Sequence, residues 1–152
     1  MRILVCAVGR ARKGPARDLY EDYVRLIRWP VDLAEVELRK NAPADARKRA
    51  EGDLLLEKVP EGSVVVALDE SGKALTSRAL AQRIGRWRDE GCACVAFLIG
   101  GADGLSEAVR DRADLALSFG RMTWPHLMVR GMLAEQIYRA QQILAGHPYH
   151  RD

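Results

Sequence analysis

The chain of 152 residues carries 24 lysines and arginines against 21 aspartates and glutamates, a formal charge of +3, and 48% of its residues are hydrophobic. This length predicts a single domain over residues 1–152, and this composition is typical of a globular protein with its own core. No apolar run approaches the roughly 20 residues that span a bilayer, so no membrane partner is expected. The modest charge permits an RNA partner but does not by itself indicate one.

The apolar segment at the start, residues 1–8, is short and runs directly into basic residues, so we interpret it as a first strand rather than a signal peptide. The odd cysteine count (Cys6, Cys92 and Cys94) without a leader predicts a reducing cytoplasm and no disulfide framework. Cys92-Ala-Cys94 lacks the spacing of a redox pair and is expected to lead into a buried strand. No histidine, cysteine or carboxylate set has the spacing of a metal site, so no metal is expected.

Hydrophobic periodicity alternates between strand-like and helix-like segments along the chain. Strands are predicted at residues 3–8, 31–38, 63–68, 95–99 and 115–118. Helices are predicted at residues 15–28, 43–58, 76–90, 106–110 and 125–144. The β-branched run at 63–68 is typical of a parallel strand covered on both faces, whereas the alternation at 31–38 indicates an edge position. This order predicts an α/β fold, a single domain with a mostly parallel sheet and helices on both faces.

A glycine-rich loop, Gly100-Gly-Ala-Asp-Gly104, follows a predicted strand and precedes a short helix. Glycine lets a ligand approach the backbone closely, and the helix start offers unpaired N–H groups. The loop lacks the Gly-x-Gly-x-x-Gly pattern of dinucleotide sites and the Gly-Lys-Ser/Thr of a P-loop. A phosphate, an adenosine-type ligand held by the backbone, and a simple tight turn all remain compatible with it.

Two further loops follow predicted strands and should lie at the same edge of the sheet, where open α/β sheets bind ligands. In Leu68-Asp-Glu-Ser-Gly72, Asp69 and Glu70 are either catalytic carboxylates or partners of nearby backbone amides. In 119–126, Pro125 is expected at the first position of the long helix, and His126 is either a base or a packing residue of the first turn. No Gly-x-Ser-x-Gly elbow or nucleophile–base pair is visible.

The long helix at 125–144 carries a wide apolar stripe, which would pack within the monomer or against a partner subunit. Arg130 and Arg139 are expected outside the core part of this stripe. The tail Tyr149-His-Arg-Asp152 places polar groups at the end of the chain.

Taken in this order, the motifs resemble the SPOUT class of methyltransferases and, more closely, its RlmH family. The resemblance covers essentially the whole chain and rests on the following segments: Leu68-Asp-Glu-Ser-Gly-Lys73, Phe97-Leu-Ile-Gly-Gly-Ala-Asp-Gly-Leu105, Ser118-Phe-Gly-Arg-Met-Thr-Trp-Pro-His126, Glu135-Gln-Ile-Tyr-Arg-Ala140 and His147-Pro-Tyr-His-Arg151. It implies a SPOUT-type α/β knot, with a trefoil knot in the C-terminal part, and a homodimer. It also implies S-adenosylmethionine as methyl donor and N3 of a pseudouridine in large-subunit (23S) ribosomal RNA as target.

The resemblance also implies roles for individual residues. The cofactor is expected to contact Leu68, Gly100, Gly101, Phe119, Gly120, Arg121, Met122, Thr123 and Trp124. The candidates for orienting or deprotonating the base are His126, Glu135, Tyr149 and His150, among which the sequence does not select. Arg130, Arg139 and Arg151 are candidates for holding phosphates or a base edge. The tail is expected to act against the partner subunit's cofactor.

The expected partner is therefore ribosomal RNA, with no DNA partner, in the cytoplasm. The modest charge favours a shaped target such as an assembled ribosomal subunit over arbitrary RNA. Two alternatives stay open at this stage: a non-enzymatic ribosome- or RNA-binding factor with a vestigial pocket, and a nucleotide-binding α/β domain that uses Gly100–Gly104 as an anion site.

Overall fold

Five parallel strands form one sheet in the order β2-β1-β4-β3-β5 in the computed structural model, which describes residues 1–151. The strands are β1 (Arg2–Val8), β2 (Val31–Val36), β3 (Val64–Lys73), β4 (Cys94–Ile99) and β5 (Leu115–Leu117). The helices are α1 (Pro15–Leu26), α2 (Ala44–Glu57), α3 (Ser77–Asp89), α4 (Glu107–Arg112) and α5 (His126–Leu144). The predicted α/β fold with a parallel sheet is confirmed, including the edge position of β2.

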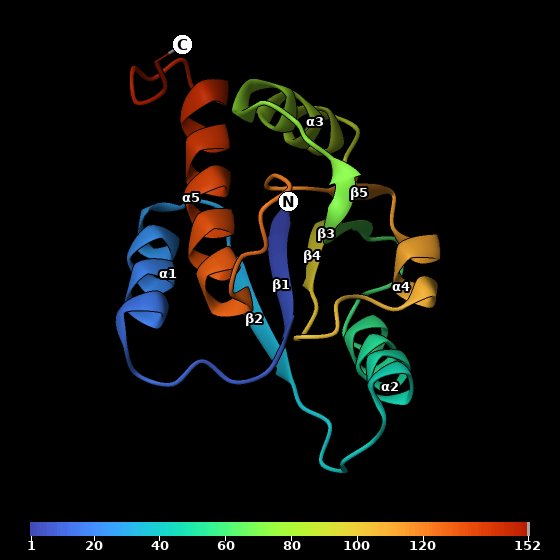
Figure 1. The fold of residues 1–152 in the computed structure, drawn as a ribbon. Helices are drawn as coiled ribbons and strands as arrows, with labels where there is room; N and C mark the ends of the chain where they lie inside the picture. Colours follow the sequence, from blue (N-terminus) through green and yellow to red (C-terminus); the bar gives the residue numbers. More distant parts are fainter. Residues whose placement is uncertain (152) are drawn as a thin grey trace.

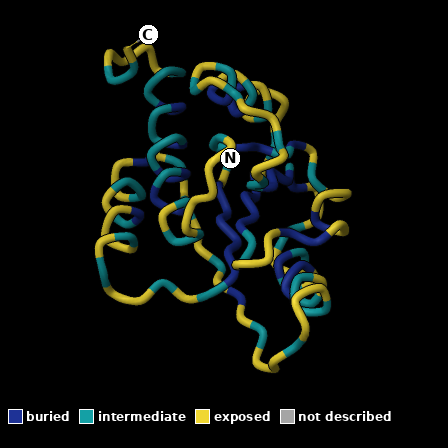
Figure 2. Tube along the Cα trace, viewed as in Figure 1, coloured by how far each residue is buried: buried dark blue, intermediate teal, exposed yellow. Residues whose placement is uncertain are grey.

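The helices cover both faces of this sheet. In Figure 1, α5 crosses one face between α1 and α3, while α2 and α4 lie on the other side. Alternate residues of each strand feed two separate apolar clusters: Val5 and Phe97 pack under α5, and Cys6 and Leu98 pack under α2 and α4. Figure 2 shows the resulting pattern, with buried strands at the centre and exposed loops around the edges. Burial on both faces explains why β4, and β1 after its first residue Arg2, consist of apolar residues.

Strand β3 continues to Lys73, past residue 68, where the β-branched run predicted its end. Both Leu68 and Lys73 have Leu117 of β5 as their partner, so the residues between them turn around the end of β5. The Ser118 amide donates to the Lys73 carbonyl at 3.0 Å, which closes this turn. A Cβ at Gly72 would lie 2.6 Å from the carbonyl carbon of Ala116. The turn therefore packs directly on the backbone of β5 and requires glycine there.

Hydroxyl side chains cap the first turns of α3 and α4. The Thr76 side chain accepts from the Ala79 amide at the start of α3, and the Ser106 side chain accepts from the Val109 amide at the start of α4. Pro125 stands at the N-cap of α5, one residue before the position expected for it. Within residues 1–151, no helix is long and apolar enough to cross a membrane.

Candidate functional site

The three loops at the carboxyl ends of β3, β4 and β5 meet around one cavity of about 720 Å³. Its wall combines apolar side chains with exposed backbone from residues 68–70, 99–105, 117, 119–120 and 122–126, together with Arg110 and Val129. These segments are up to 58 positions apart in the sequence, and the parallel sheet brings them together because each follows a strand end. A cavity of this size and apolar character is typical of a site for a small organic ligand.

The glycine loop after β4 is tight because of its glycines. The Gly104 amide donates to the Gly101 carbonyl at 3.1 Å, and Gly104 has a φ of +82°, which other residues rarely adopt. A Cβ at Gly100 would lie 2.7 Å from the Gly104 carbonyl oxygen. The turn and the close approach therefore both depend on glycine, and the backbone of the loop is bare toward the cavity.

The β3 turn supplies the second wall, held by a carboxylate with two structural partners. Asp69 accepts from the amide and the hydroxyl of Ser71, and it pairs with Arg110 of α4 at 2.6 Å. Burial alone would raise the pKa of Asp69, but the hydrogen bonds from Ser71 and Arg110 outweigh it and hold that pKa below its usual range. Asp69 is thus a fixed, ionised anchor that ties the turn to α4, and the structural interpretation of this acid is supported. No local pattern indicated its partner Arg110, which lies 41 positions away in the sequence.

The third wall is the loop between β5 and α5. The Gly120 amide donates to the Ser118 hydroxyl, that hydroxyl donates back to the Gly120 carbonyl, and Gly120 has a φ of +114°. The Trp124 indole N–H donates to the Phe119 carbonyl at 3.4 Å, which folds the loop over itself. Met122 remains 74% exposed and Trp124 39% exposed while both line the cavity. Two large apolar side chains at a cavity mouth are positioned to cover an aromatic ligand.

His126 begins α5 and lines the same cavity. Its imidazole Nε2 lies 3.7 Å from the position a Cβ at Gly9 would take, so the ring stands between the cavity and the end of β1. Burial, and then the positive charge of Arg130, lower the pKa of His126. The helix N-terminus acts in the same direction. The ring is therefore neutral near neutral pH and able to accept a proton.

We expect a nuclear magnetic resonance titration of His126 to show a midpoint below the ordinary value for histidine. The charged form is disfavoured in the folded state, so protonation in mild acid favours unfolding, and this part of the stability is lost as the pH falls below the unfolded pKa. A midpoint at or above the ordinary value for histidine would contradict the prediction.

Arg130 lies elsewhere than expected. It is 1% exposed, and its guanidinium donates to the carboxylate of Glu35 at 2.7 Å and to the carbonyl of Gly9 at 2.7 Å. A third donation reaches the Val8 carbonyl at 3.2 Å. The apolar stripe of α5 thus includes this arginine, because the open ends of β1 offer carbonyls to pair with it. Arg130 is an internal anchor and is not available to a phosphate.

The remaining candidates lie together, but away from this cavity. Glu135 accepts from Arg139 and from the Tyr149 hydroxyl, and Arg139 also contacts His150 at 3.2 Å. Burial, a hydrogen bond with Tyr23 and the charge of Glu135 raise the pKa of Tyr149 well above its usual range, which disfavours a phenolate base. The tail therefore folds back on α5, where these polar residues form one network.

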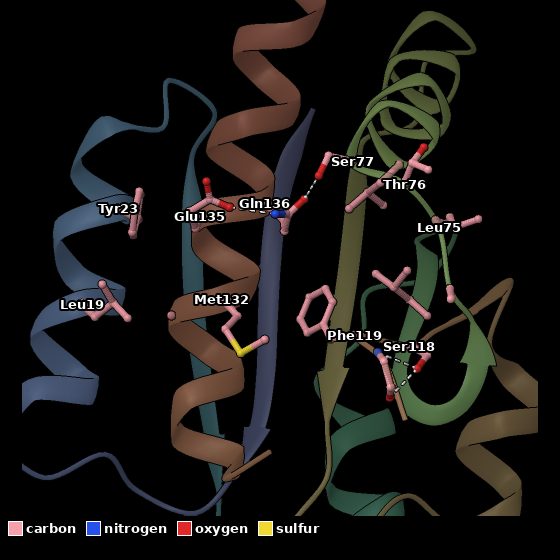
Figure 3. A pocket seen from close by; sticks show the side chains of 15 residues that line it. Leu19, Tyr23, Leu75, Thr76, Ser77, Ser118, Phe119, Met132, Glu135 and Gln136 are labelled. Atoms are coloured by element: carbon pink, nitrogen blue, oxygen red, sulfur yellow. Dashed lines mark hydrogen bonds between the residues drawn. The ribbon is translucent and has the colours of Figure 1, made fainter. Parts of the chain in front are cut away.

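That network borders a second cavity of about 590 Å³ between α1, α5 and the start of α3 (Figure 3). Glu135 and Gln136 face it from α5, Ser77 bonds Gln136 at 2.7 Å, and Leu19 lines it from α1. Leu117, Phe119 and Gly120 line both cavities, so the two cavities adjoin at the end of β5 and the start of the loop that follows it.

The structure thus divides the predicted site residues into two groups. Around the first cavity lie Leu68, Gly100, Gly101, Phe119, Gly120, Met122, Thr123, Trp124 and His126. Arg121 belongs to the same loop but is not part of the cavity wall. Glu135, Tyr149, His150 and Arg151 do not line it. Within residues 1–151, no group of three or more histidine, cysteine or carboxylate side chains is arranged to hold a metal ion.

This arrangement, a parallel sheet whose last strand is enclosed by the turn of β3 and whose three carboxyl-end loops share one cavity, agrees with the comparisons. The family described as "Predicted SPOUT methyltransferase" matches residues 1–150, and the chain belongs to this class of enzymes. Ribosomal RNA large subunit methyltransferase H of Rhodospirillum centenum is 64% identical over 151 residues, 99% of each chain. The proteins of the same name from Paramagnetospirillum magneticum and Cereibacter sphaeroides are 56% and 54% identical, again over 99% of each chain. Within the class, the chain therefore falls in the RlmH family.

Proposed function

We propose that this protein is an S-adenosylmethionine-dependent methyltransferase that modifies N3 of a pseudouridine in large-subunit (23S) ribosomal RNA, in the cytoplasm. The observation that carries the proposal is the convergence of three loops on one cavity, in a chain whose relatives are named as ribosomal RNA methyltransferases. The non-enzymatic factor and the nucleotide-binding domain are less favoured, since the matching family and the named relatives are methyltransferases.

The residues around the first cavity fit the proposed donor. Leu68, Ile99, Leu117 and Val129 supply apolar walls, and the bare backbone of the glycine loop and of 118–124 supplies donors and acceptors for an adenosine. The side chains of Met122 and Trp124 stand at the mouth, where they can pack on the ligand. A triphosphate would need free lysine or arginine side chains. Among the described residues, Arg110 is the one lysine or arginine in the cavity wall, and it is already paired with Asp69.

When bound, S-adenosylmethionine supplies a methyl group on a positively charged sulfur, which is already a good electrophile. The protein then has to align the nucleobase and to remove the proton of its imide nitrogen. In well-oriented reactions, alignment alone lowers the activation barrier by roughly 7–11 kcal/mol. His126 is the residue best placed to receive the proton, because its ring is neutral and lies in the cavity wall.

Two measurements test this function. Isothermal titration calorimetry is expected to show one S-adenosylmethionine site per chain, with no competition from adenosine triphosphate. Mass spectrometry of 23S ribosomal RNA from cells without the gene is expected to show the loss of one methyl group on a pseudouridine. Competition by nucleotides without binding of the donor would favour the nucleotide-binding domain. Donor binding with an unchanged RNA would refute the proposed substrate.

The resemblance to SPOUT enzymes further suggests a homodimer and a C-terminal knot. In support of a dimer, Leu19 and Leu26 of α1 are 43% and 53% exposed, and Leu19 lines the groove between α1 and α5. In support of a knot, the turn of 69–72 wraps the end of β5, after which the chain continues into the cavity loop and α5. In a dimer of this kind, the tail network would complete the partner subunit's site.

Deleting residues 149–152 tests the role of the tail. The deletion removes the Tyr149 hydroxyl from Glu135 and the His150 ring from Arg139, but it touches no wall of the first cavity. We therefore expect methylation to fall at least about tenfold, equivalent to about 1.4 kcal/mol of transition-state stabilisation, with donor affinity unchanged. Both quantities are measured on the same preparation, and Tyr149→Phe, which removes only the hydroxyl, should show the same direction. Full activity of the truncated protein would exclude a role for the tail.

A further inference from the structure

Exposed basic residues gather on two loops at the carboxyl edge of the sheet. Arg10, Arg12 and Lys13 follow β1, and Arg39 and Lys40 follow β2. Arg10 pairs weakly with Glu37 at 3.5 Å. The other four form no ion pair with any residue in the described range 1–151, and all four are exposed.

The two loops lie side by side. Val8 pairs with Val36 at the ends of β1 and β2, and the Gly9 amide donates to the Val36 carbonyl at 2.8 Å. The Ala11 amide donates to Glu35, so the first loop is fastened to the strand from which the second one departs. In Figure 1 both loops extend beyond the carboxyl ends of the strands.

The first loop also leaves the fold beside the cavity. Arg130 holds the Gly9 carbonyl at 2.7 Å, and the His126 ring lies 3.7 Å from the place of a Cβ at Gly9. A Cβ at Gly101 would likewise lie 3.1 Å from the Val8 side chain, so the glycine loop touches the same strand end. The first basic loop therefore begins at residues that contact two walls of the cavity, and the second loop departs from the neighbouring strand.

The local charge is out of proportion to that of the molecule. Residues 9–14 and 37–43 hold five basic residues and one acidic residue, Glu37, a net of +4 against +3 for the whole chain. Like charges held close together repel one another and destabilise the fold, so such a cluster favours a polyanionic partner. Phosphates of RNA match this chemistry, because lysine and arginine contact them without regard to sequence.

We infer that these two loops, defined here as the basic edge (residues 9–14 and 37–43), bind the phosphate backbone on either side of the target nucleotide. The basic edge holds the RNA across the mouth of the cavity, and the cavity residues act on the base. This inference rests on the proposed function, whose substrate it places on a particular face of the protein.

Charge-neutralising pairs test the basic edge. The variants are Arg12→Gln with Lys13→Gln, Arg39→Gln with Lys40→Gln, and all four together. The control is Lys58→Gln with Arg86→Gln, two exposed residues at the ends of α2 and α3, where the chain returns to the amino ends of the strands. Each pair removes the same charge. Affinities for protein-free 23S ribosomal RNA and for intact large subunits are measured as a function of salt, alongside donor affinity and methylation of large subunits.

Each basic-edge pair is expected to weaken RNA binding about tenfold and to reduce the slope of log affinity against log salt by about 1–2, while the control pair and all donor affinities stay at the wild-type level. RNA affinities equal to that of the control would overturn the inference. Weakened binding to intact subunits but not to protein-free RNA would also overturn it, because the partner would then be a ribosomal protein. A wild-type protein that methylates no RNA would instead refute the proposed function, and RNA affinity alone would then decide the role of the basic edge.

Discussion

Arg130→Met is expected to lower the free energy of unfolding by about 3 kcal/mol, the lower end of the cost of breaking a buried ion pair. Arg130 is 1% exposed, whereas its partner Glu35 keeps 28% of its side chain accessible, which places the cost at the lower end. The substitution also removes the donor to the Gly9 carbonyl. For a chain of this length, the melting temperature should fall by roughly 6–12 °C at fixed protein concentration.

Arg139→Met is the matched control, because it makes the same change on the same helix. Arg139 pairs with Glu135, but its side chain is 25% exposed, and we expect a loss of about 1 kcal/mol or less. Adding Glu35→Gln to Arg130→Met should recover part of the lost stability, because it removes the carboxylate left without a partner. Equal losses for the two arginines would show that Arg130 is not an internal anchor.

The pH dependence of the difference in unfolding free energy between wild type and Arg130→Met is a second measurement. Burial alone would raise the pKa of Glu35, but hydrogen bonds from Arg130 and the Ala11 amide outweigh it and hold that pKa below its usual range. A carboxylate with a lowered folded-state pKa stabilises the fold above its unfolded pKa, and that contribution is lost as the pH falls through the folded value. The gap between wild type and Arg130→Met should therefore be widest near pH 7 and narrow in acid.

Local patterns were sufficient for the elements and for one side of the site. Strands buried on both faces consist mainly of apolar residues, so the sequence alone predicted strands at residues 95–99 and 63–68. Because parallel strands end at the same edge of a sheet, the loops that follow these strands were expected to share that edge. Gly100, Trp124 and His126 could therefore be grouped from the sequence alone, and the structure places all three around one cavity.

Contacts between residues that are far apart in the sequence could not be predicted from local patterns. The periodicity of α5 gives no reason to bury Arg130, since the carbonyls that it satisfies belong to residues more than 100 positions away. The pairing of Asp69 with Arg110 and the turn of 69–72 around β5 are likewise tertiary. The burial of Glu51 is a further feature that local patterns did not predict. This residue is 8% exposed, lies 3.2 Å from the place of a Cβ at Gly101, and its pKa is raised by burial and by Asp103.

Gly72→Ala is expected to disturb the fold and the cavity together. A Cβ there would lie 2.6–2.8 Å from backbone atoms of Ala116 and Leu117, and a strand backbone cannot rotate away as a side chain can. We expect a loss of about 2–3 kcal/mol in unfolding free energy, the upper range for overpacking. Leu68 and Asp69 in the same turn line the cavity, so displacement of the turn should also weaken S-adenosylmethionine binding by about tenfold.

Lys73→Ala is the control, because it shows whether any substitution beside the turn lowers stability and donor affinity as Gly72→Ala does. Lys73 is the next residue, its side chain is exposed, and the loss of that side chain leaves the Lys73 carbonyl free to accept from Ser118. Its stability should stay within about 0.5 kcal/mol of wild type, as for most surface substitutions. Donor affinity is compared at a temperature where both variants are fully folded. If Gly72→Ala binds the donor as tightly as Lys73→Ala does, the close packing of the turn on β5 does not shape the cavity, and the site must be held by the other two loops alone.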